Sequence, residues 1–403
     1  MNNIGTLYLA EIKKIISKKS VWLTLIVGTA LVCLVLASNV LFEKYEYPDG
    51  SKVSGINFYK HEAEECSKLS GRTIDDKFLD EIRDKISKFA LEKDYLTEEQ
   101  LGQLKKNIDK PARMETEDGF IYENTPMVAL DSAAEQLGIS DCWYFLQDTL
   151  DDNQNVMTCT AEDFNKSFAD GVDTPMVYTY QQGYDIFIES AWICVWLLFL
   201  LITLSLAGIF AYDRQTKMDA LIVSSRNGRR PLAAAKLLAG YTVAVIETLV
   251  VFGAVLAVCV GIYSGQGWDG PIQMFVPNTS WNASAGQIIL TYLAIIFVMG
   301  ILFASASMML SGFCGGAQTL GIQMGVLMIG FFNLPFNNII SHLWDLRPTT
   351  FLTAGILQNN YLFQLGTIQL NCVEMASLLY IIATLAFSIA TITTYRKYQV
   401  KSR

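Results

Sequence analysis

The sequence predicts an all-α polytopic membrane protein with six transmembrane helices, an N-terminal interfacial helix and a large, mainly helical extracytoplasmic domain between the first two spans. The first observation is composition. The 403-residue chain is 52% hydrophobic and only 17% charged, whereas a soluble protein is usually about a quarter charged. The second is the placement of charge. Residues 43–185 hold 15 Lys/Arg and 31 Asp/Glu, a net charge of −16, and the rest of the chain carries +7.

This composition excludes three broad classes. A plain soluble enzyme would carry more charge, and a disordered chain would be less hydrophobic. A nucleic-acid-binding protein usually carries a basic patch or stripe, whereas the polar part of this chain is acidic. The expected partner is therefore a lipid membrane, and no nucleic acid.

Six segments supply the ~20 apolar residues that ~30 Å of hydrocarbon requires. The first is uncharged, and its apolar core is too long for a cleaved signal peptide, so we expect a retained anchor. The expected spans are residues 21–42, 186–211, 237–263, 285–311, 317–340 and 373–394.

Lys and Arg in the short loops set the orientation, because such loops favour the cytoplasm. Basic side chains cluster before the first span, between the second and third spans, and in the tail at residues 395–403. With six spans, all three segments lie on one side of the membrane. Both termini are therefore expected in the cytoplasm, and residues 43–185 outside.

Residues 1–20 are expected to form an interfacial helix. Apolar side chains recur at helical spacing from Ile4 to Ile16, and Glu11, Lys14 and Lys18 take the other side. An amphipathic basic helix of this kind lies in the plane of the membrane surface. The alternative interpretation is a simple stop-transfer flank.

The acidic region, residues 43–185, is expected to fold as helices around a small core. The segments beginning at Thr73 and Thr97 resemble capping boxes, and residues 128–150 and a short segment from Thr160 are further helix candidates. The acidic surface either attracts a cationic substrate or is only a solvated surface.

Cysteines offer one candidate disulfide, between Cys142 and Cys159, which would close a short loop in this region. An oxidising exterior permits the bridge without requiring it. Cys66 leaves an odd number of cysteines in the region, which weakens any complete pairing scheme. No CxxC spacing is present, so no metal site is expected.

Catalytic motifs are missing from the sequence. His61 and His342 are the only histidines, and neither belongs to an HExxH pair. There is no GxSxG elbow and no GxxxxGK[ST] phosphate loop. We therefore expect no enzyme activity, no catalytic residue and no cofactor on this chain.

Residues 212–236, with the sequence YDRQTKMDALIVSSRNGRRPLAAAK, are the most informative stretch. They are expected to be a cytoplasmic loop with a short helix, a turn, and a new helix with Pro231 in its first turn. A short helix fixed to two spans acts as a mechanical coupler, since pushing it tilts both spans. The alternative is a basic stop-transfer segment.

In these residues the chain resembles the permease subunit of a type-2 ABC exporter. That family has an acidic start, a Leu-rich short helix, a Ser/Thr–Arg turn and a Lys at the third span, which fall here on Asp213, residues 220–225, Arg226 and Lys236. The segment from Glu11 to Lys14 resembles the interfacial connecting helix of that family. The family usually has Glu at the position of Asp213 and often a Pro in the turn, and the resemblance does not cover residues 43–185.

The resemblance implies a permease of the bacterial plasma membrane, powered by two copies of a separate ATP-binding subunit that holds ATP and Mg. A second permease, either another copy or a related chain, would complete the unit. The implied cargo is a peptide, an antimicrobial or an amphiphile. The residues implied to couple to the ATPase subunit are Asp213, Arg214, Lys217, Leu221, Ser224, Ser225 and Arg226.

Candidates for a pathway or a dimer interface are Glu247, Asn333, Asn337 and Asn338. A carboxylate inside the third span is expensive unless it faces protein or water, and a local hydrogen bond is the alternative. The asparagines break the fifth span, and with residues 341–372 they predict a short re-entrant helix pair on the outer side.

Two other functions are compatible with these observations. One is a membrane sensor or immunity protein whose outer domain binds a ligand and signals without transport. The other is an ion-coupled carrier, which should show more buried charge than Glu189 and Glu247 and an inverted repeat that is not evident.

Overall fold

The computed structural model is mostly helical. It describes residues 3–106, 114–116, 119–121, 126–148, 175–216, 230–276, 279, 281–330, 332, 339–348, 351, 357 and 362–397.

The chain divides into two compact units, each assembled from segments that are distant in sequence. The first unit comprises Met1–Leu34, Glu189–Leu256 and Leu290–Arg403. The second comprises Val35–Ile188 and Ala257–Ile289.

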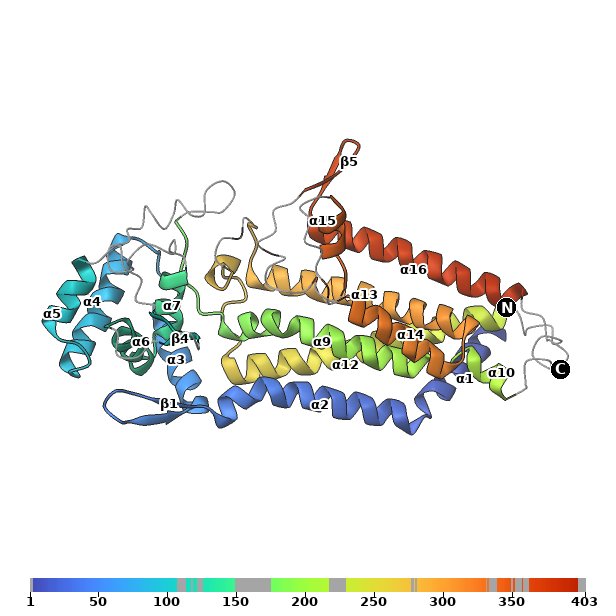
Figure 1. Ribbon diagram of the computed structural model, residues 1–403, viewed down its shortest axis with the longest axis horizontal. Coiled ribbons are helices and arrows are strands. Elements are labelled where there is room, and N and C mark those ends of the chain that lie inside the picture. Colours follow the sequence, from blue (N-terminus) through green and yellow to red (C-terminus); the bar gives the residue numbers. More distant parts are fainter. Residues whose placement is uncertain are drawn as a thin grey trace. The chain divides into compact units, whose positions relative to one another are not determined.

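Five helices in the described residues are long and apolar enough to cross a membrane. Figure 1 shows that they run alongside one another. Their length and composition are those of a multi-pass membrane protein. They are α2 (Lys19–Phe42), α9 (Gln182–Leu206), α12 (Arg230–Tyr263), α13 (Ala285–Phe313) and α16 (Cys372–Lys397).

The fifth expected span, residues 317–340, is not one long helix. The helix found there, α14 (Gly316–Ile329), has 14 residues, about 21 Å at 1.5 Å per residue, which is short of the ~30 Å hydrocarbon thickness. The carbonyls just beyond its end are taken by side chains in and after α15 (Ile339–Asp345). Arg347 Nε donates to Gly330 O and Trp344 Nε1 donates to Phe332 O, both at 2.6 Å.

Within the first unit the helices approach closely at small residues. A Cβ added at Gly300 of α13 would lie 2.7 Å from Thr248 Oγ1 of α12. A Cβ at Gly28 of α2 would lie 2.8 Å from the side chain of Leu197 on α9. Of the apolar segment of α9, 67% is buried, whereas only 22% of the corresponding segments of α2 and α16 is buried. Helix α9 is therefore central, and α2 and α16 expose the apolar surface that lipid would cover.

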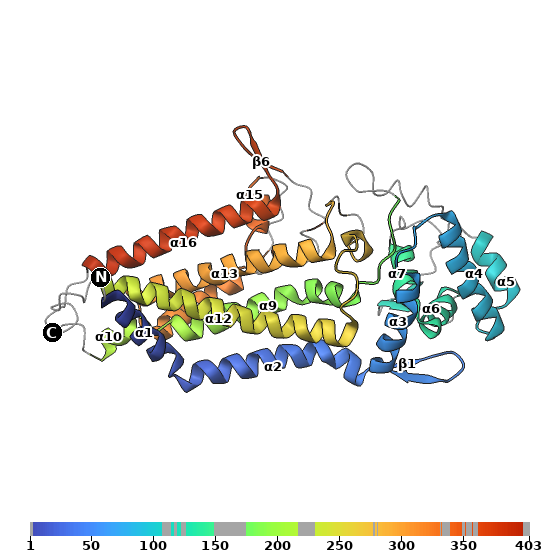
Figure 2. The same ribbon diagram turned by 180° about the vertical axis from the view of Figure 1, so that it is seen from behind.

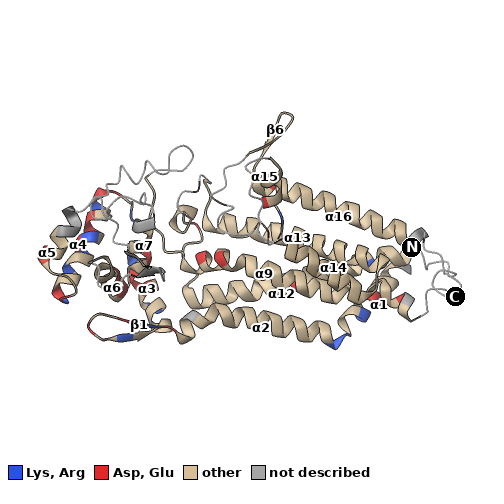
Figure 3. Cartoon of the chain, viewed as in Figure 1, with Lys and Arg blue, Asp and Glu red and all other residues tan. Residues whose placement is uncertain are grey.

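The second unit contains shorter helices around a core of its own, in agreement with the mainly helical prediction. Fully buried core residues include Ile82, Ile86, Leu130 and Trp143. Figure 3 shows that charged residues gather on these helices and are sparse along the five long ones. The helices are α3 (Gly55–Leu69), α4 (Asp76–Glu92), α5 (Glu98–Lys106), α6 (Pro126–Leu137) and α7 (Ser140–Asp148).

Local signals decide where these helices begin and end. The capping box at Thr97 is confirmed, because Thr97 N donates to Gln100 Oε1 and Gln100 N donates to Thr97 Oγ1. The N-cap of α4 is Asp75, which accepts from Phe78 N, and not Thr73. The single helix expected over residues 128–150 breaks at Gly138, whose φ of +69° favours glycine. The segment from Thr160 lies outside the described residues.

The remaining described elements are short. Three antiparallel hairpins pair β1 (Lys44–Glu46) with β2 (Lys52–Ser54), β3 (Met114–Thr116) with β4 (Gly119–Ile121), and β5 (Phe363–Leu365) with β6 (Ile368–Leu370). The helix pair expected at residues 341–372 is, in the described residues, one helix, α15, and the β5–β6 hairpin. The interfacial helix expected at residues 1–20 corresponds to α1 (Asn3–Ile16), which ends before α2 begins.

Gly183, in the first turn of α9, leads to a first prediction. A Cβ there would lie 2.0 Å from the backbone oxygen of Ser264, so Gly183→Ala should lower the unfolding free energy by about 1–3 kcal/mol through overpacking. Thermal unfolding of the purified chain in detergent measures this. The control is Gly261→Ala in α12, where a Cβ meets nothing within 4 Å and alanine favours the helix. Equal stability of Gly183→Ala and wild type would contradict the close approach.

Candidate functional site

The residues expected to couple to an ATPase subunit are only partly described. Asp213 and Arg214 lie in α10 (Ala211–Gln215), and Asp213 is buried. Helix α12 begins at Arg230, seven residues before the expected start of the third span. The others lie outside the described residues, namely Lys217, Leu221, Ser224, Ser225 and Arg226.

Four charged side chains from three helices meet at Asp213. Lys236 of α12 places its Nζ 2.8 Å from Asp213 Oδ2 and 3.5 Å from Glu11 Oε2. Lys14 Nζ lies 3.1 Å from Asp213 Oδ1 and 3.9 Å from Glu11 Oε1. We call Glu11, Lys14, Asp213 and Lys236 the charge cluster. It holds two carboxylates and two ammonium groups, so its formal charges cancel.

Lys236 is the most buried member of the charge cluster, with no exposed surface. Its ammonium also donates to the carbonyl of Ile209 at 2.7 Å and lies 5.5 Å from the centre of the Phe210 ring. A buried ammonium costs several kcal/mol unless it is paired and hydrogen bonded. The two carboxylates and the carbonyl meet that requirement, and they fix the start of α12 against the end of α9.

The rest of the site holds α1 and α10 in place. Helix α1 buries Ile15, and the hydroxyl of its Tyr8 lies 2.9 Å from Thr242 Oγ1 of α12. At α10, the backbone N–H groups of Phe210 and Ala211 donate to Ser311 Oγ of α13. These are donors at the start of a helix, which have no partner within the helix itself. Figures 1 and 2, seen from opposite sides, both place α1 and α10 beside the start of α12.

The charge cluster is a joint in the structural sense, because its ion pairs tie α1, α10 and α12 together. Its carboxylates face ammonium groups, and no nucleophile lies among them. Among the residues that the structure describes, no group of three or more His, Cys, Asp or Glu side chains could hold a metal ion. What the joint can do is carry displacement between α1, α10 and α12.

Glu247 lies inside α12 and is 2% exposed. Its Oε1 accepts a hydrogen bond from Ser205 Oγ of α9, and its Oε2 has no hydrogen-bond partner among the described residues. Asn333, Asn337 and Asn338 lie outside the described residues. Their grouping with Glu247 in a pathway or a dimer interface therefore stays a prediction.

Cys142 is buried in α7, and burial raises the pKa of its thiol well above its ordinary value. Cys159 lies outside the described residues, so their pairing also stays a prediction.

Helix α1 contributes two charged side chains whose pairing with Asp213 and Lys236 is not evident from the sequence. Glu11 and Lys14 were interpreted as the polar side of an amphipathic helix, whereas both belong to the charge cluster. The signal that could have found this pairing is Lys236 itself, because a lysine at the entry of an apolar span requires a carboxylate nearby.

Comparison of the chain with protein-family models finds no match, and comparison with curated proteins and with solved structures finds none either. The function is therefore argued from the chain's own geometry.

The charge cluster leads to a second prediction. Lys236→Met should lower the unfolding free energy by about 3–5 kcal/mol, because it leaves two buried carboxylates with only Lys14 to balance them. Thermal unfolding in detergent and the yield of folded protein measure this. Lys13→Met, at an exposed position of the same helix as Lys14, is the control and should stay within about 0.5 kcal/mol of wild type.

A double variant sharpens the test of the charge cluster. Adding Asp213→Asn to Lys236→Met removes one positive and one negative charge, so part of the lost stability should return. Two results would contradict this charge pairing between the three helices. One is that Lys236→Met unfolds at the wild-type temperature. The other is that the loss of stability in the double variant equals the sum of the losses in the two single variants.

Proposed function

We propose that the chain is the transmembrane permease subunit of an ATP-driven ABC exporter in the bacterial plasma membrane. The observation that carries the proposal is the charge cluster. It ties α10, which precedes residues 217–229, to α12, which follows them, and it ties both helices to α1. A separate ATP-binding subunit would supply the energy, because this chain has no phosphate loop.

The contacts of the charge cluster support a coupling role for residues 217–229. A push on this segment would reach α10 on one side and the first turn of α12 on the other. Lys236 binds the carbonyl of Ile209, and Ser311 of α13 binds the start of α10. The displacement would therefore be shared by α9, α12 and α13 instead of being absorbed by local bending. Coupling between sites needs a packed, contiguous route of this kind.

The proposed topology has six crossings, with both termini in the cytoplasm and residues 43–185 outside. Helix α14 and the residues up to Arg347 would make the remaining crossing as a broken element. Ser307 Oγ of α13 donates to Gln323 Oε1 of α14 at 3.0 Å, which supports their packing. A broken crossing must shield its free carbonyls from lipid. Arg347 and Trp344 provide that shielding at the end of α14.

The working unit would contain two permeases, either two copies of this chain or this chain and a related one, and two ATP-binding subunits that carry ATP and Mg. A peptide, an antimicrobial or an amphiphile is the proposed cargo. The observation in favour of the alternative, a membrane sensor, is the hydrophobic core that the shorter helices of the second unit build for themselves.

Co-purification tests the permease proposal. The tagged full-length chain, extracted in mild detergent, should bring down an ATP-binding subunit that is identified by mass spectrometry and hydrolyses ATP. Replacing residues 217–229 with a Gly/Ser linker of equal length should lose that subunit or uncouple its hydrolysis. The matched control is an equal-length Gly/Ser replacement of residues 364–369 in the β5–β6 hairpin, which should retain both.

Two results would contradict the permease proposal. One is that no ATP-binding subunit co-purifies in several detergents, and the other is that the linker variant retains coupled hydrolysis. Recovery of a histidine kinase with the wild-type chain would favour the sensor.

A further inference from the structure

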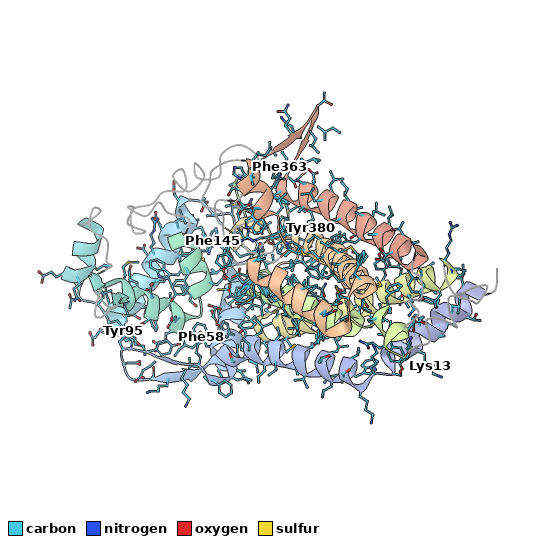
Figure 4. The ribbon with its side chains drawn as sticks, turned by 45° about the vertical axis from the view of Figure 1, so that its right-hand side comes forward. Lys13, Phe58, Tyr95, Phe145, Phe363 and Tyr380 are labelled. Atoms are coloured by element: carbon cyan, nitrogen blue, oxygen red, sulfur yellow. The ribbon has the colours of Figure 1, made fainter. Side chains whose placement is uncertain are left out.

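A cavity of about 340 Å³ lies within the second unit, among α3, α6, α7 and the start of α9. Ligand pockets usually span about 300–1,000 Å³, so this cavity suits a small molecule or one side group of a larger one. Aromatic rings make up much of its wall, namely Tyr45, Phe58, Tyr59, Tyr144, Phe145 and Phe275. Figure 4 labels Phe58 of α3 and Phe145 of α7.

The polar part of the wall is negatively charged. Glu62, Glu135, Asp141 and Asp185 all line the cavity, and no Lys, Arg or His is among the lining residues that the structure describes. Glu62 is 4% exposed, although it is ionisable. Four carboxylates with no cationic side chain among the described lining residues give the cavity a negative potential, which raises the local concentration of cations.

Hydrogen bonds hold the inner carboxylates in position without neutralising them. Glu62 Oε1 accepts from Ser140 Oγ and from the N–H of Asp141, and Glu62 Oε2 accepts from the hydroxyl of Tyr180 at 3.3 Å. Asp141 Oδ2 accepts from the hydroxyl of Tyr178 at 2.5 Å. All of these donors are uncharged.

Glu62 and Asp141 differ from the carboxylates of the charge cluster, because each carboxylate of the charge cluster faces an ammonium group. Burial raises the pKa of Glu62 and of Asp141, and the negative charge of Asp141 raises that of Glu62 further. Burial also raises the pKa of Glu135, which accepts from Tyr144 at 3.1 Å. A cation placed in the cavity would relieve this repulsion.

The aromatic rings in the wall pack against one another. Tyr45 stacks on Phe58 with ring centres 3.8 Å apart, and Tyr59 meets Phe58 edge-on at 5.2 Å. Aromatic rings in a cavity wall attract a cation that lies over one of their faces. An alkali or alkaline-earth ion would prefer a shell of oxygen ligands to these rings. No group of acidic side chains that could hold a metal is present in the described part of the chain.

We propose that this cavity binds an organic cation, a primary ammonium or guanidinium group carried on an apolar body. The carboxylates hold the charged head, and the aromatic rings cover the apolar body. The proposal does not rest on transport, because the binding site would serve an exporter and a sensor equally.

Three size-matched probes test the charge preference of the cavity. Calorimetric titration of the purified full-length chain in detergent at pH 8 would use 2-phenylethylamine, neutral 2-phenylethanol and anionic 3-phenylpropanoate. The amine should bind at least tenfold more tightly than the alcohol, and the carboxylate should not bind. Equal affinity for amine and alcohol would overturn the proposal, since it would show an apolar cavity without charge selection.

Variants locate the binding in this cavity. Glu62→Gln and Glu135→Gln should each weaken amine binding at least fivefold, because they remove a charge and keep the side chain's size. Glu99→Gln, at an exposed position of α5, is the matched control and should bind as wild type does. If Glu62→Gln does not fold, Asp185→Asn at the start of α9 takes its place. Unchanged affinity in all cavity variants would overturn the proposal.

The pH dependence gives an independent readout. Because the folded-state pKa values of Glu62 and Asp141 are raised, these groups take up protons at a higher pH than ordinary carboxylates do. Amine binding should therefore already weaken as the pH falls from 8 to 5, and alcohol binding should not. The titratable groups that face this pair are Glu135 of α6, Tyr59 and Cys66 of α3, Asp185 of α9, and Tyr178 and Tyr180 before α9.

The raised pKa values also determine how the stability of the folded protein changes with pH. A carboxylate whose pKa is raised by folding binds more protons in the folded state, so its contribution to stability is lost as the pH rises. A bound amine compensates for that loss. The amine should therefore raise the unfolding temperature more at pH 8 than at pH 5, and an equal shift at both values would contradict the role of these carboxylates.

Discussion

The buried ammonium of Lys236 is the constraint on which the first unit depends. No solvent reaches this group, so its charge must be balanced by the protein. Asp213 and Glu11 provide the balance, and they come from α10 and from the N-terminal helix α1. Three segments that are far apart in the sequence are thereby fixed to one point. An N-terminal helix that would otherwise only flank a span becomes a structural part of the core.

The two units use buried charge in opposite ways. In the charge cluster, two carboxylates meet two ammonium groups within about 4 Å, and the protein needs nothing from outside. In the cavity of the second unit, the donors to Glu62 and Asp141 among the described residues are uncharged. A balanced cluster favours a fixed geometry, whereas an unbalanced one favours a ligand of opposite charge. The difference between the charge cluster and the proposed binding site therefore follows from the charge balance and not from the kind of residue.

Hydropathy and local capping signals predicted the elements that depend on neighbouring residues. The five long helices were located to within several residues, and the capping box at Thr97 was correct. Features that depend on distant side chains could not be located in this way. A hydropathy window cannot detect that Arg347 and Trp344 take the carbonyls after α14, and so it extended this helix into a full span. It also could not detect that Glu11 would neutralise Lys236, 225 residues further along the chain.

The charge cluster is asymmetric, and the asymmetry bears on the proposed coupling role. Lys236 is fully enclosed, whereas the side chain of Lys14 is 32% exposed and lies 4.5 Å from the ring centre of Tyr212, which is also exposed. An acidic group on a partner that approaches this surface would meet Lys14 first. It could draw Lys14 away from Asp213 without uncovering Lys236, which would keep Asp213, Glu11 and the carbonyl of Ile209. Contact with a partner would then remove one of the two ammonium groups that face Asp213 and shift α1, while the ion pair between Asp213 and Lys236 stays intact.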